Sequence, residues 1–97
     1  MRIVFTARAT DDIENVVSYG IQEWGEEQAR SYLDGMLQSI QQLADHPDLG
    51  VACDEIRPGW RVLTIQQHLA FFHTFGESVV ILRVVHHRMD RRRFSGS

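Results

Sequence analysis

Two stretches in the first half of the chain repeat apolar residues every three or four positions. They cover residues 7–24 and 26–44. This spacing gathers apolar side chains on one face of an α-helix. We expect Thr6 to cap the first helix, Gly25 to separate the two, and Pro47 to end the second, because proline has no amide donor. The pattern therefore predicts an antiparallel helical hairpin.

The second half of the chain changes to the β-branched and aromatic composition of strands. Three such runs cover residues 60–65, 68–75 and 79–86, and turns of two or three residues separate them. Short connections of this kind join antiparallel neighbours. A further short run, residues 2–5, precedes the helices. We predict an α+β fold: an N-terminal strand, an antiparallel helical hairpin, then a three-stranded antiparallel meander, all in one antiparallel sheet with the hairpin on one face.

The last predicted strand contains an arginine, Arg83, among apolar residues. A guanidinium group is not buried without a partner, so Arg83 either faces solvent or binds an acid. Side chains alternate along a strand, which fixes the residues that share a face. The face with Arg83 would hold Val79, Ile81, Val85 and His87, and the opposite, core face would hold Val80, Leu82, Val84 and His86.

The second face of the sheet has no predicted cover. We expect this bare face to carry Arg61 and Arg83 and to receive a partner. Large apolar residues at strand spacing are expected to fill the core beneath the helices instead. These are Phe71, Phe72 and Phe75.

Length and composition indicate one globular domain, residues 1–97, in which residues 91–97 form a charged tail. Hydrophobic content of 43% and charged content of 24% are ordinary for a folded protein, which argues against disorder. No apolar run approaches the roughly 20 residues of a membrane span, and no signal peptide is recognised, so we expect a cytoplasmic protein. The single cysteine, Cys53, excludes an internal disulfide and fits a reducing compartment.

Charge is divided unequally between the two halves. Residues 1–55 hold three arginines and eleven acids (−8), and residues 56–97 hold seven arginines and two acids (+5), which sum to the net charge of −3. All the basic residues are arginine, which binds carboxylates and phosphates through a planar fork. A genomic preference for arginine codons gives the same excess of arginine over lysine. The acidic total argues against general nucleic-acid binding. Arg91 to Arg93 form either a solvated tail or an electrostatic contact for a partner.

No metal or cofactor site is predicted. His86 and His87 are adjacent, and adjacent residues on a strand point to opposite faces, so they do not share an ion. The remaining histidines, His46, His68 and His73, are expected to be half exposed and to have no chemical role.

Several short motifs occur along the chain in a fixed order. Together they resemble the ParE toxins of the RelE/ParE superfamily, from about Ile3 to Phe94. The motifs are Trp24-Gly25, Ala29 and Tyr32, Leu43-Ala44, Pro47 to Gly50, Gly59-x-Arg61, His68-Leu69-Ala70-Phe71-Phe72 and Ile81-Leu82-Arg83-Val84-Val85-His86-x-Arg88-Met89-Asp90.

This resemblance implies the toxin of a bacterial type II toxin-antitoxin pair, of the kind that stabilises plasmids. Such a toxin inhibits DNA gyrase, and so replication and growth, without catalysing a reaction of its own. A small ParD-like antitoxin with a ribbon-helix-helix start would neutralise it in a hetero-oligomer. No cofactor, metal or membrane is implied.

The resemblance also implies which residues meet these partners. The gyrase-binding residues would be Arg61, Arg83, His87, Arg88, Met89 and Asp90. The antitoxin-binding residues would be Trp60, Phe71, Phe72 and Arg83.

Two alternatives remain open at this point. RelE-type relatives cleave mRNA in the ribosome, and Arg61, Arg83 and His87, or His86, would form such a nuclease site. Against this alternative, the chain has no lysine and both tyrosines lie in the predicted helices. The other alternative is a decayed toxin that binds antitoxin only.

Overall fold

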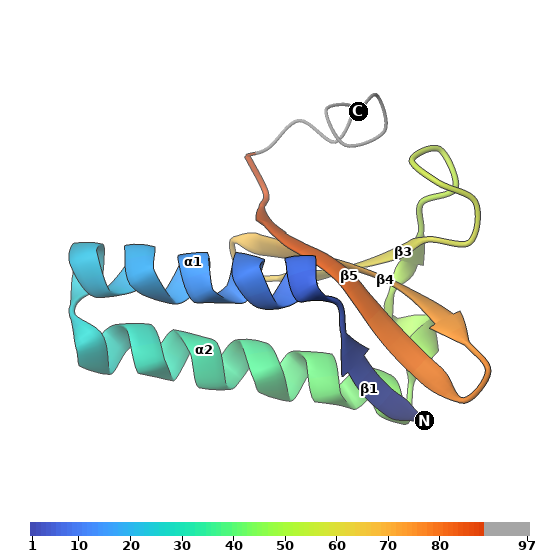
Figure 1. Ribbon diagram of the computed structural model, residues 1–97, viewed down its shortest axis with the longest axis horizontal. Helices are drawn as coiled ribbons and strands as arrows, with labels where there is room; N and C mark the ends of the chain where they lie inside the picture. Colours follow the sequence, from blue (N-terminus) through green and yellow to red (C-terminus); the bar gives the residue numbers. More distant parts are fainter. Residues whose placement is uncertain (89–97) are drawn as a thin grey trace.

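A computed structural model describes residues 1–88 and has the predicted α+β order, with two helices packed against a sheet (Figure 1). Its elements are β1 (Arg2–Phe5), α1 (Ala7–Trp24), α2 (Glu26–Gln41), the 3-10 turns η1 (Gln42–Ala44) and η2 (Pro47–Leu49), β2 (Val51–Ala52), β3 (Arg61–Ile65), β4 (His68–Phe75) and β5 (Ser78–His86). The N-terminal strand, the hairpin and the meander are thereby confirmed.

The sheet is mixed, which corrects the prediction that it is wholly antiparallel. Its strand order is β1-β5-β4-β3-β2, and β3, β4 and β5 form the antiparallel meander. β1 instead runs parallel to β5, from Arg2 opposite Ser78 to Phe5 opposite Ile81. The whole helical hairpin lies between β1 and the meander in sequence and supplies the long crossover that a parallel neighbour requires.

The helical hairpin forms for the predicted local reasons. The Thr6 hydroxyl accepts the Ala9 amide at 3.0 Å and caps α1. Gly25 separates the helices, with φ of 91°. Gly20 is buried where the helices cross, and a Cβ built there would lie 3.2 Å from the Ala29 Cβ. The second helix tightens into η1 for its last turn, a common way to end a helix.

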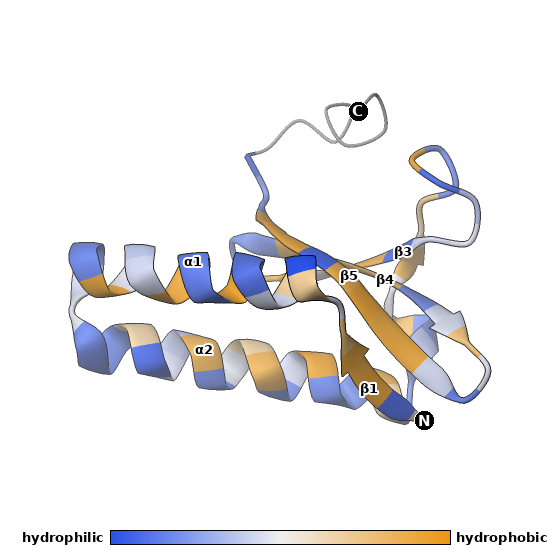
Figure 2. Ribbon diagram, viewed as in Figure 1, coloured by the Kyte–Doolittle hydropathy of each residue, from blue (hydrophilic) through white to orange (hydrophobic). Residues whose placement is uncertain are grey.

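Two apolar clusters lie on opposite faces of the sheet. The larger one joins the helices to the sheet and includes Met36, Ile40, Phe72 and Ile81. Figure 2 shows the corresponding apolar stretches of β1 and β5, and helices that alternate between apolar and polar residues. The second cluster consists of Cys53, Ile56, Val62, Phe71 and Val85, with Trp60 and Leu69 packed against it. The segment from 53 to 60 therefore covers part of the face that was expected to be bare.

A β-bulge in β5 overturns the predicted division of its two faces. Ala70 pairs with Val84 and Phe71 with Arg83, but Phe72 pairs with Ile81, so Leu82 is an extra residue in the strand. One inserted residue reverses the alternation of side chains beyond it. Val79, Ile81 and Val84 consequently enter the helix-side core, and Val85 enters the second cluster.

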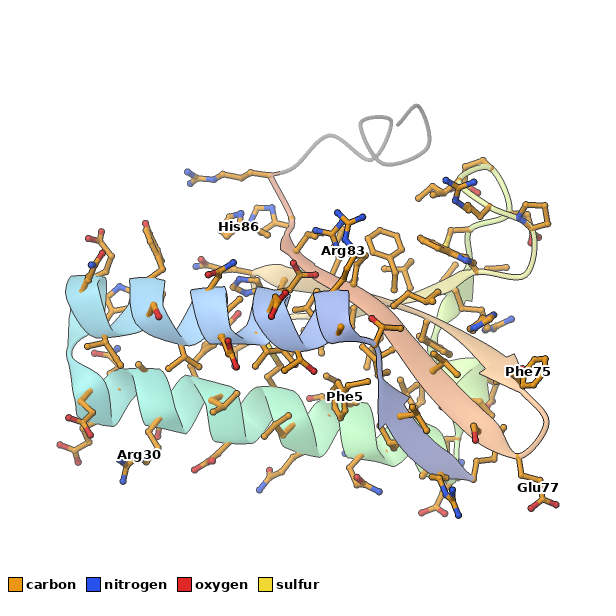
Figure 3. All side chains as sticks on the ribbon, in the orientation of Figure 1. Phe5, Arg30, Phe75, Glu77, Arg83 and His86 are labelled. Carbon is orange, nitrogen blue, oxygen red and sulfur yellow. The ribbon has the colours of Figure 1, made fainter. Side chains whose placement is uncertain are left out.

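One phenylalanine of the predicted core lies outside it. Phe71 and Phe72 are fully buried, whereas Phe75 is 75% exposed (Figure 3). β4 extends beyond its pairing with β3, which reaches only as far as Phe72, so the end of β4 projects from the body of the sheet. The prediction for Phe75 was therefore wrong.

Gly50 offers a test of packing at the edge of the sheet. A Cβ added there would overlap the Phe72 ring, which has no free space because it is fully buried. We expect Gly50→Ala to lower the free energy of unfolding by about 1–3 kcal/mol in urea titrations. Gly35→Ala is the matched control, because a Cβ in the middle of α2 meets nothing within 4 Å. That variant should be as stable as the parent or more so by up to about 1 kcal/mol. Equal stability of the two variants would contradict this packing.

Candidate functional site

Beyond Ile81, helix α1 takes the place of β1 along the edge of β5. The Thr6 amide donates to the Ile81 carbonyl at 3.1 Å, and the Thr6 hydroxyl donates to the Leu82 carbonyl at 3.0 Å. Six residues further on, the Asp12 carboxylate accepts the Val84 amide at 2.9 Å. Thr6, the cap of α1, and Asp12 therefore satisfy backbone groups that a neighbouring strand would otherwise pair.

The same carboxylate binds Arg83. Its two oxygens accept hydrogen bonds from Arg83 Nε at 2.8 Å and from Nη2 at 3.1 Å. The side chains are only 19% and 15% exposed, for Arg83 and Asp12 respectively. Of the two alternatives open for Arg83, binding an acid is therefore correct, and the expectation of a guanidinium presented on a bare face is wrong.

Arg61 and Arg83 do not share a face of the sheet. Arg61 pairs with Phe72, which belongs to the helix-side core, and Arg83 pairs with Phe71, which belongs to the second cluster. Directly paired residues on neighbouring strands project to the same side, so the two arginines project to opposite sides. Arg61 Nη2 donates to the Gly50 carbonyl, which anchors the start of β2. The expected pair of arginines on one surface is therefore contradicted.

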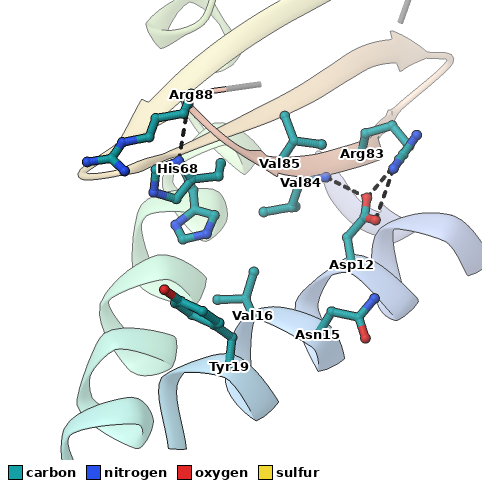
Figure 4. Close-up of a pocket in the computed structure, with 10 residues that line it drawn as sticks. Asp12, Asn15, Val16, Tyr19, His68, Arg83, Val84, Val85 and Arg88 are labelled. Atoms are coloured by element: carbon teal, nitrogen blue, oxygen red, sulfur yellow. Dashed lines mark hydrogen bonds and ion pairs between the residues drawn. The ribbon is translucent and has the colours of Figure 1, made fainter. Parts of the chain in front are cut away.

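A cavity of about 450 Å³ opens between α1 and the end of β5 (Figure 4). The helix contributes Asn15, Val16 and Tyr19, and the sheet contributes Val84 and Val85 to the apolar part. His68, His86 and Arg88 line the same cavity, and the Asp12–Arg83 pair forms one of its boundaries. Polar and titratable groups thus gather around an apolar floor, the usual composition of a ligand site.

Three histidines and a tyrosine form a connected cluster at this cavity. The Tyr32 hydroxyl lies 2.6 Å from His68 Nδ1. The His68 and His86 ring centroids are 5.3 Å apart, and those of His86 and His87 are 4.6 Å apart in a stacked arrangement. The Arg88 amide donates to His86 Nδ1 at 3.1 Å.

This arrangement disfavours the charged forms of His68 and His86. Burial lowers the pKa of His68, and the nearby His86 and His87 lower it further. Burial also lowers the pKa of His86, with smaller contributions from His87 and Arg88. Burial raises the pKa of Tyr32, against a hydrogen bond from the Gln67 amide. His68 is only 8% exposed, so the prediction that it is half exposed was wrong.

The predicted antitoxin-binding residues differ in their accessibility. Trp60 is half-buried over the second cluster, with its ring centroid 5.9 Å from that of Phe71. Phe71 and Phe72 are fully buried, so a partner does not touch them directly in this conformation. Of this set, only Trp60 and Arg83 present any accessible surface.

The predicted gyrase-binding residues lie at or beyond the end of β5. His87 and Arg88 are exposed there. Met89 and Asp90, and the basic run Arg91 to Arg93, lie outside the described residues.

Within residues 1–88, no group of three or more His, Cys, Asp and Glu side chains is arranged to hold a metal ion. Over the same range, no helix has the length and apolarity needed to cross a membrane. Cys53 is buried in the second cluster.

Sequence reasoning missed Asp12, Tyr32 and His68 as parts of this site. Only Asp12 had a signal, since Arg83 in an apolar strand called for an acid. Tyr32 and His68 occur among the motifs that carry the family resemblance, but nothing in the sequence indicates that the two side chains meet.

The Asp12–Arg83 pair should contribute substantially to stability. Asp12→Ala removes a carboxylate that accepts hydrogen bonds from the largely buried Arg83 and from the Val84 amide, so we expect the free energy of unfolding to fall by about 2–4 kcal/mol. Arg30→Ala is the control, because its ion pair with Glu26 is on the surface, with side chains 72% and 73% exposed. It should cost less than about 0.5 kcal/mol. Chemical unfolding of both variants measures the difference, and comparable losses would refute a special role for Asp12.

The histidine cluster should make the stability of the protein depend on pH. The folded protein holds the pKa of His68 and of His86 below the usual value of 6.5, so it binds fewer protons than the unfolded chain near that pH. The contribution of these two histidines to the free energy of unfolding is therefore complete above pH 6.5 and is lost as the pH falls below it. His68→Gln should flatten the decline between pH 7.5 and 5.5, whereas His73→Gln, outside the cluster, should not. A decline unchanged by His68→Gln in thermal unfolding would contradict this assignment.

This chain is similar to known proteins in both sequence and fold. Residues 3–91 match the family described as ParE toxin of type II toxin-antitoxin system, parDE. Toxin ParE1 of Mycobacterium tuberculosis is 37% identical over 90 residues, which is 92% of each chain. Toxin ParE1 of Caulobacter vibrioides is 34% identical over 89 residues, again 92% of each chain.

Solved structures agree with this relationship at the level of fold. A chain from the chromosomal ParDE TA system of P. aeruginosa superposes with a TM-score of 0.79 at 23% identity, covering 89% of this chain and 95% of that one. The YoeB/ParE toxin from Agrobacterium tumefaciens superposes with a TM-score of 0.63 at 16% identity, covering 90% and 99%. The match over residues 3–91 and the identity with the two ParE1 toxins show that the chain belongs to the ParE toxins of type II toxin-antitoxin systems, within the RelE/ParE superfamily.

Proposed function

We propose that this ParE-family toxin acts by binding DNA gyrase and blocking replication, without catalysing a reaction of its own. The observation that carries the proposal is the family match over residues 3–91, which includes the whole described body and the end of β5. The proposed setting is the bacterial cytoplasm, where a partner antitoxin holds the toxin inactive.

The proposed gyrase contact is the end of β5. His87 and Arg88 are exposed there, and Arg88 has no ion-pair partner within residues 1–88. Met89 and Asp90 follow directly and belong to the proposed contact. Arg83 acts indirectly in this proposal: its bond to Asp12 fixes α1 against β5 and so positions the strand end.

Arg61 has a comparable indirect role in the proposal. Its guanidinium holds the Gly50 carbonyl, which keeps β2 at the edge of the sheet. Neither Arg61 nor Arg83 is then needed as a free cation for the target.

The proposed partner is a ParD-like antitoxin that forms a hetero-oligomer with the toxin. Its contact would include Trp60, which packs against the second cluster, and Arg83, since both are partly exposed. Phe71 would support this surface from beneath instead of touching the antitoxin. If antitoxin and gyrase cannot bind at once, mass action between the two complexes determines how much toxin is free.

The nuclease alternative gains no support from the geometry. A metal-independent ribonuclease needs its cations and its acid or base around one phosphate. Arg61 and Arg83 project to opposite faces of the sheet, so these two residues and His87 do not converge on one point.

Supercoiling by purified gyrase tests the proposed function. Free toxin should inhibit the reaction, and Arg88→Ala should raise the concentration needed for half inhibition about tenfold, the effect of losing about 1.4 kcal/mol at an interface. Arg30→Ala, on the outer face of α2, should inhibit like the parent. The proposal is wrong if the parent protein leaves supercoiling unchanged at a large molar excess over gyrase.

A further inference from the structure

The cavity between α1 and β5 has an uncompensated positive side. Its one lining acid, Asp12, is already bonded to Arg83 and to the Val84 amide. Arg88 also lines the cavity, is exposed, and has no acid partner among residues 1–88. His86 and His68 also line the space as neutral hydrogen-bonding rings, so the unpaired charge of Arg88 favours an anion there.

The hydrogen bonding of His86 suits an anion as well. Its Nδ1 accepts the Arg88 amide, so the neutral ring carries its proton on Nε2. His86 can therefore donate from Nε2 without first gaining a proton. The guanidinium of Arg88 supplies further donors in a planar fork that matches phosphate geometry.

The opposite wall of the cavity is aromatic and apolar. Tyr19 lines the cavity and is 58% exposed. Trp24 lies outside the lining but packs against Tyr19, with ring centroids 6.2 Å apart in an edge-to-face arrangement. Val16 lies next to Tyr19 on the same helix and lines the same space. Large exposed rings beside a guanidinium group are the combination with which proteins stack a base and hold its phosphate.

A polar group for the edge of a base is also present. Asn15 lines the cavity from α1 and offers both a donor and an acceptor through its amide. The cavity volume of about 450 Å³ is within the range of small-molecule sites.

We propose that the cavity between α1 and the end of β5 binds a nucleoside monophosphate, with its phosphate on Arg88 and His86 and its base against Tyr19. The charged and titratable groups that line this cavity are Asp12 from α1, His68 from β4, Arg83 and His86 from β5, and Arg88 beyond it. Tyr32 of α2 adds a neutral hydroxyl behind His68. This inference does not depend on gyrase being the target.

Isothermal titration with adenosine 5′-monophosphate tests the site on the full chain. The nucleotide should bind at least tenfold more tightly than either adenosine or inorganic phosphate, because each of these lacks one of the two contacts. Arg88→Ala and Tyr19→Ala should each weaken nucleotide binding at least tenfold.

Matched variants separate this effect from general damage. Arg30→Ala removes an exposed arginine on α2, and Phe75→Ala removes an exposed ring at the far end of β4, so both should bind like the parent. Unchanged thermal unfolding of Arg88→Ala and Tyr19→Ala identifies their loss as a loss of contact. Absence of binding at millimolar nucleotide, equal binding of phosphate alone, or parental affinity in Arg88→Ala would each overturn the proposal.

Discussion

The Asp12 carboxylate holds together the part of the molecule on which the rest of the structure depends. β1 accompanies β5 only as far as Ile81, which leaves the following residues of β5 at an open edge. Asp12 closes that edge by accepting the Val84 amide and two hydrogen bonds from Arg83. One side chain thus pairs backbone that has no neighbouring strand and also binds a largely buried cation.

This bond places the first half of α1 beside the end of β5, and it therefore shapes the cavity between them. The titratable groups of the site collect at that end because β4 starts, and β5 finishes, at the cross-strand pair His68 and His86. Tyr32 reaches His68 from α2, so both helices contribute to the same end of the sheet. The chemistry of the molecule is consequently concentrated at an edge and a strand end, where the sequence had suggested a broad face.

Local patterns were enough to predict the elements of the fold. The Thr6 cap, the break at Gly25 and the run from 68 to 75 are properties of neighbouring residues, and each is found where the sequence placed it. The parallel pairing of β1 was missed because it joins segments about 76 positions apart, as in the pair Arg2 and Ser78. Composition carries no information about such a partner.

The site was less predictable, for reasons that lie in particular residues. The bulge at Leu82 leaves the composition of β5 unchanged, yet it reverses which side chains face the helices. An acidic partner was only one of two alternatives for Arg83, several acids of the first helix were available, and only the packing of α1 on β5 selects Asp12. Burial of His68 depends on Tyr32, which reads as an ordinary helical core residue until the two are brought together.

A double-mutant cycle on Asp12 and Arg83 tests the central claim most directly. Unfolding free energies of the parent, Asp12→Ala, Arg83→Ala and the double variant give the coupling energy between the two side chains. If Asp12 joins α1 to β5 as described, the coupling should be about 1.5–3 kcal/mol. A coupling below about 0.3 kcal/mol would mean that the two residues act independently, and the helix would then be held to the sheet by something else.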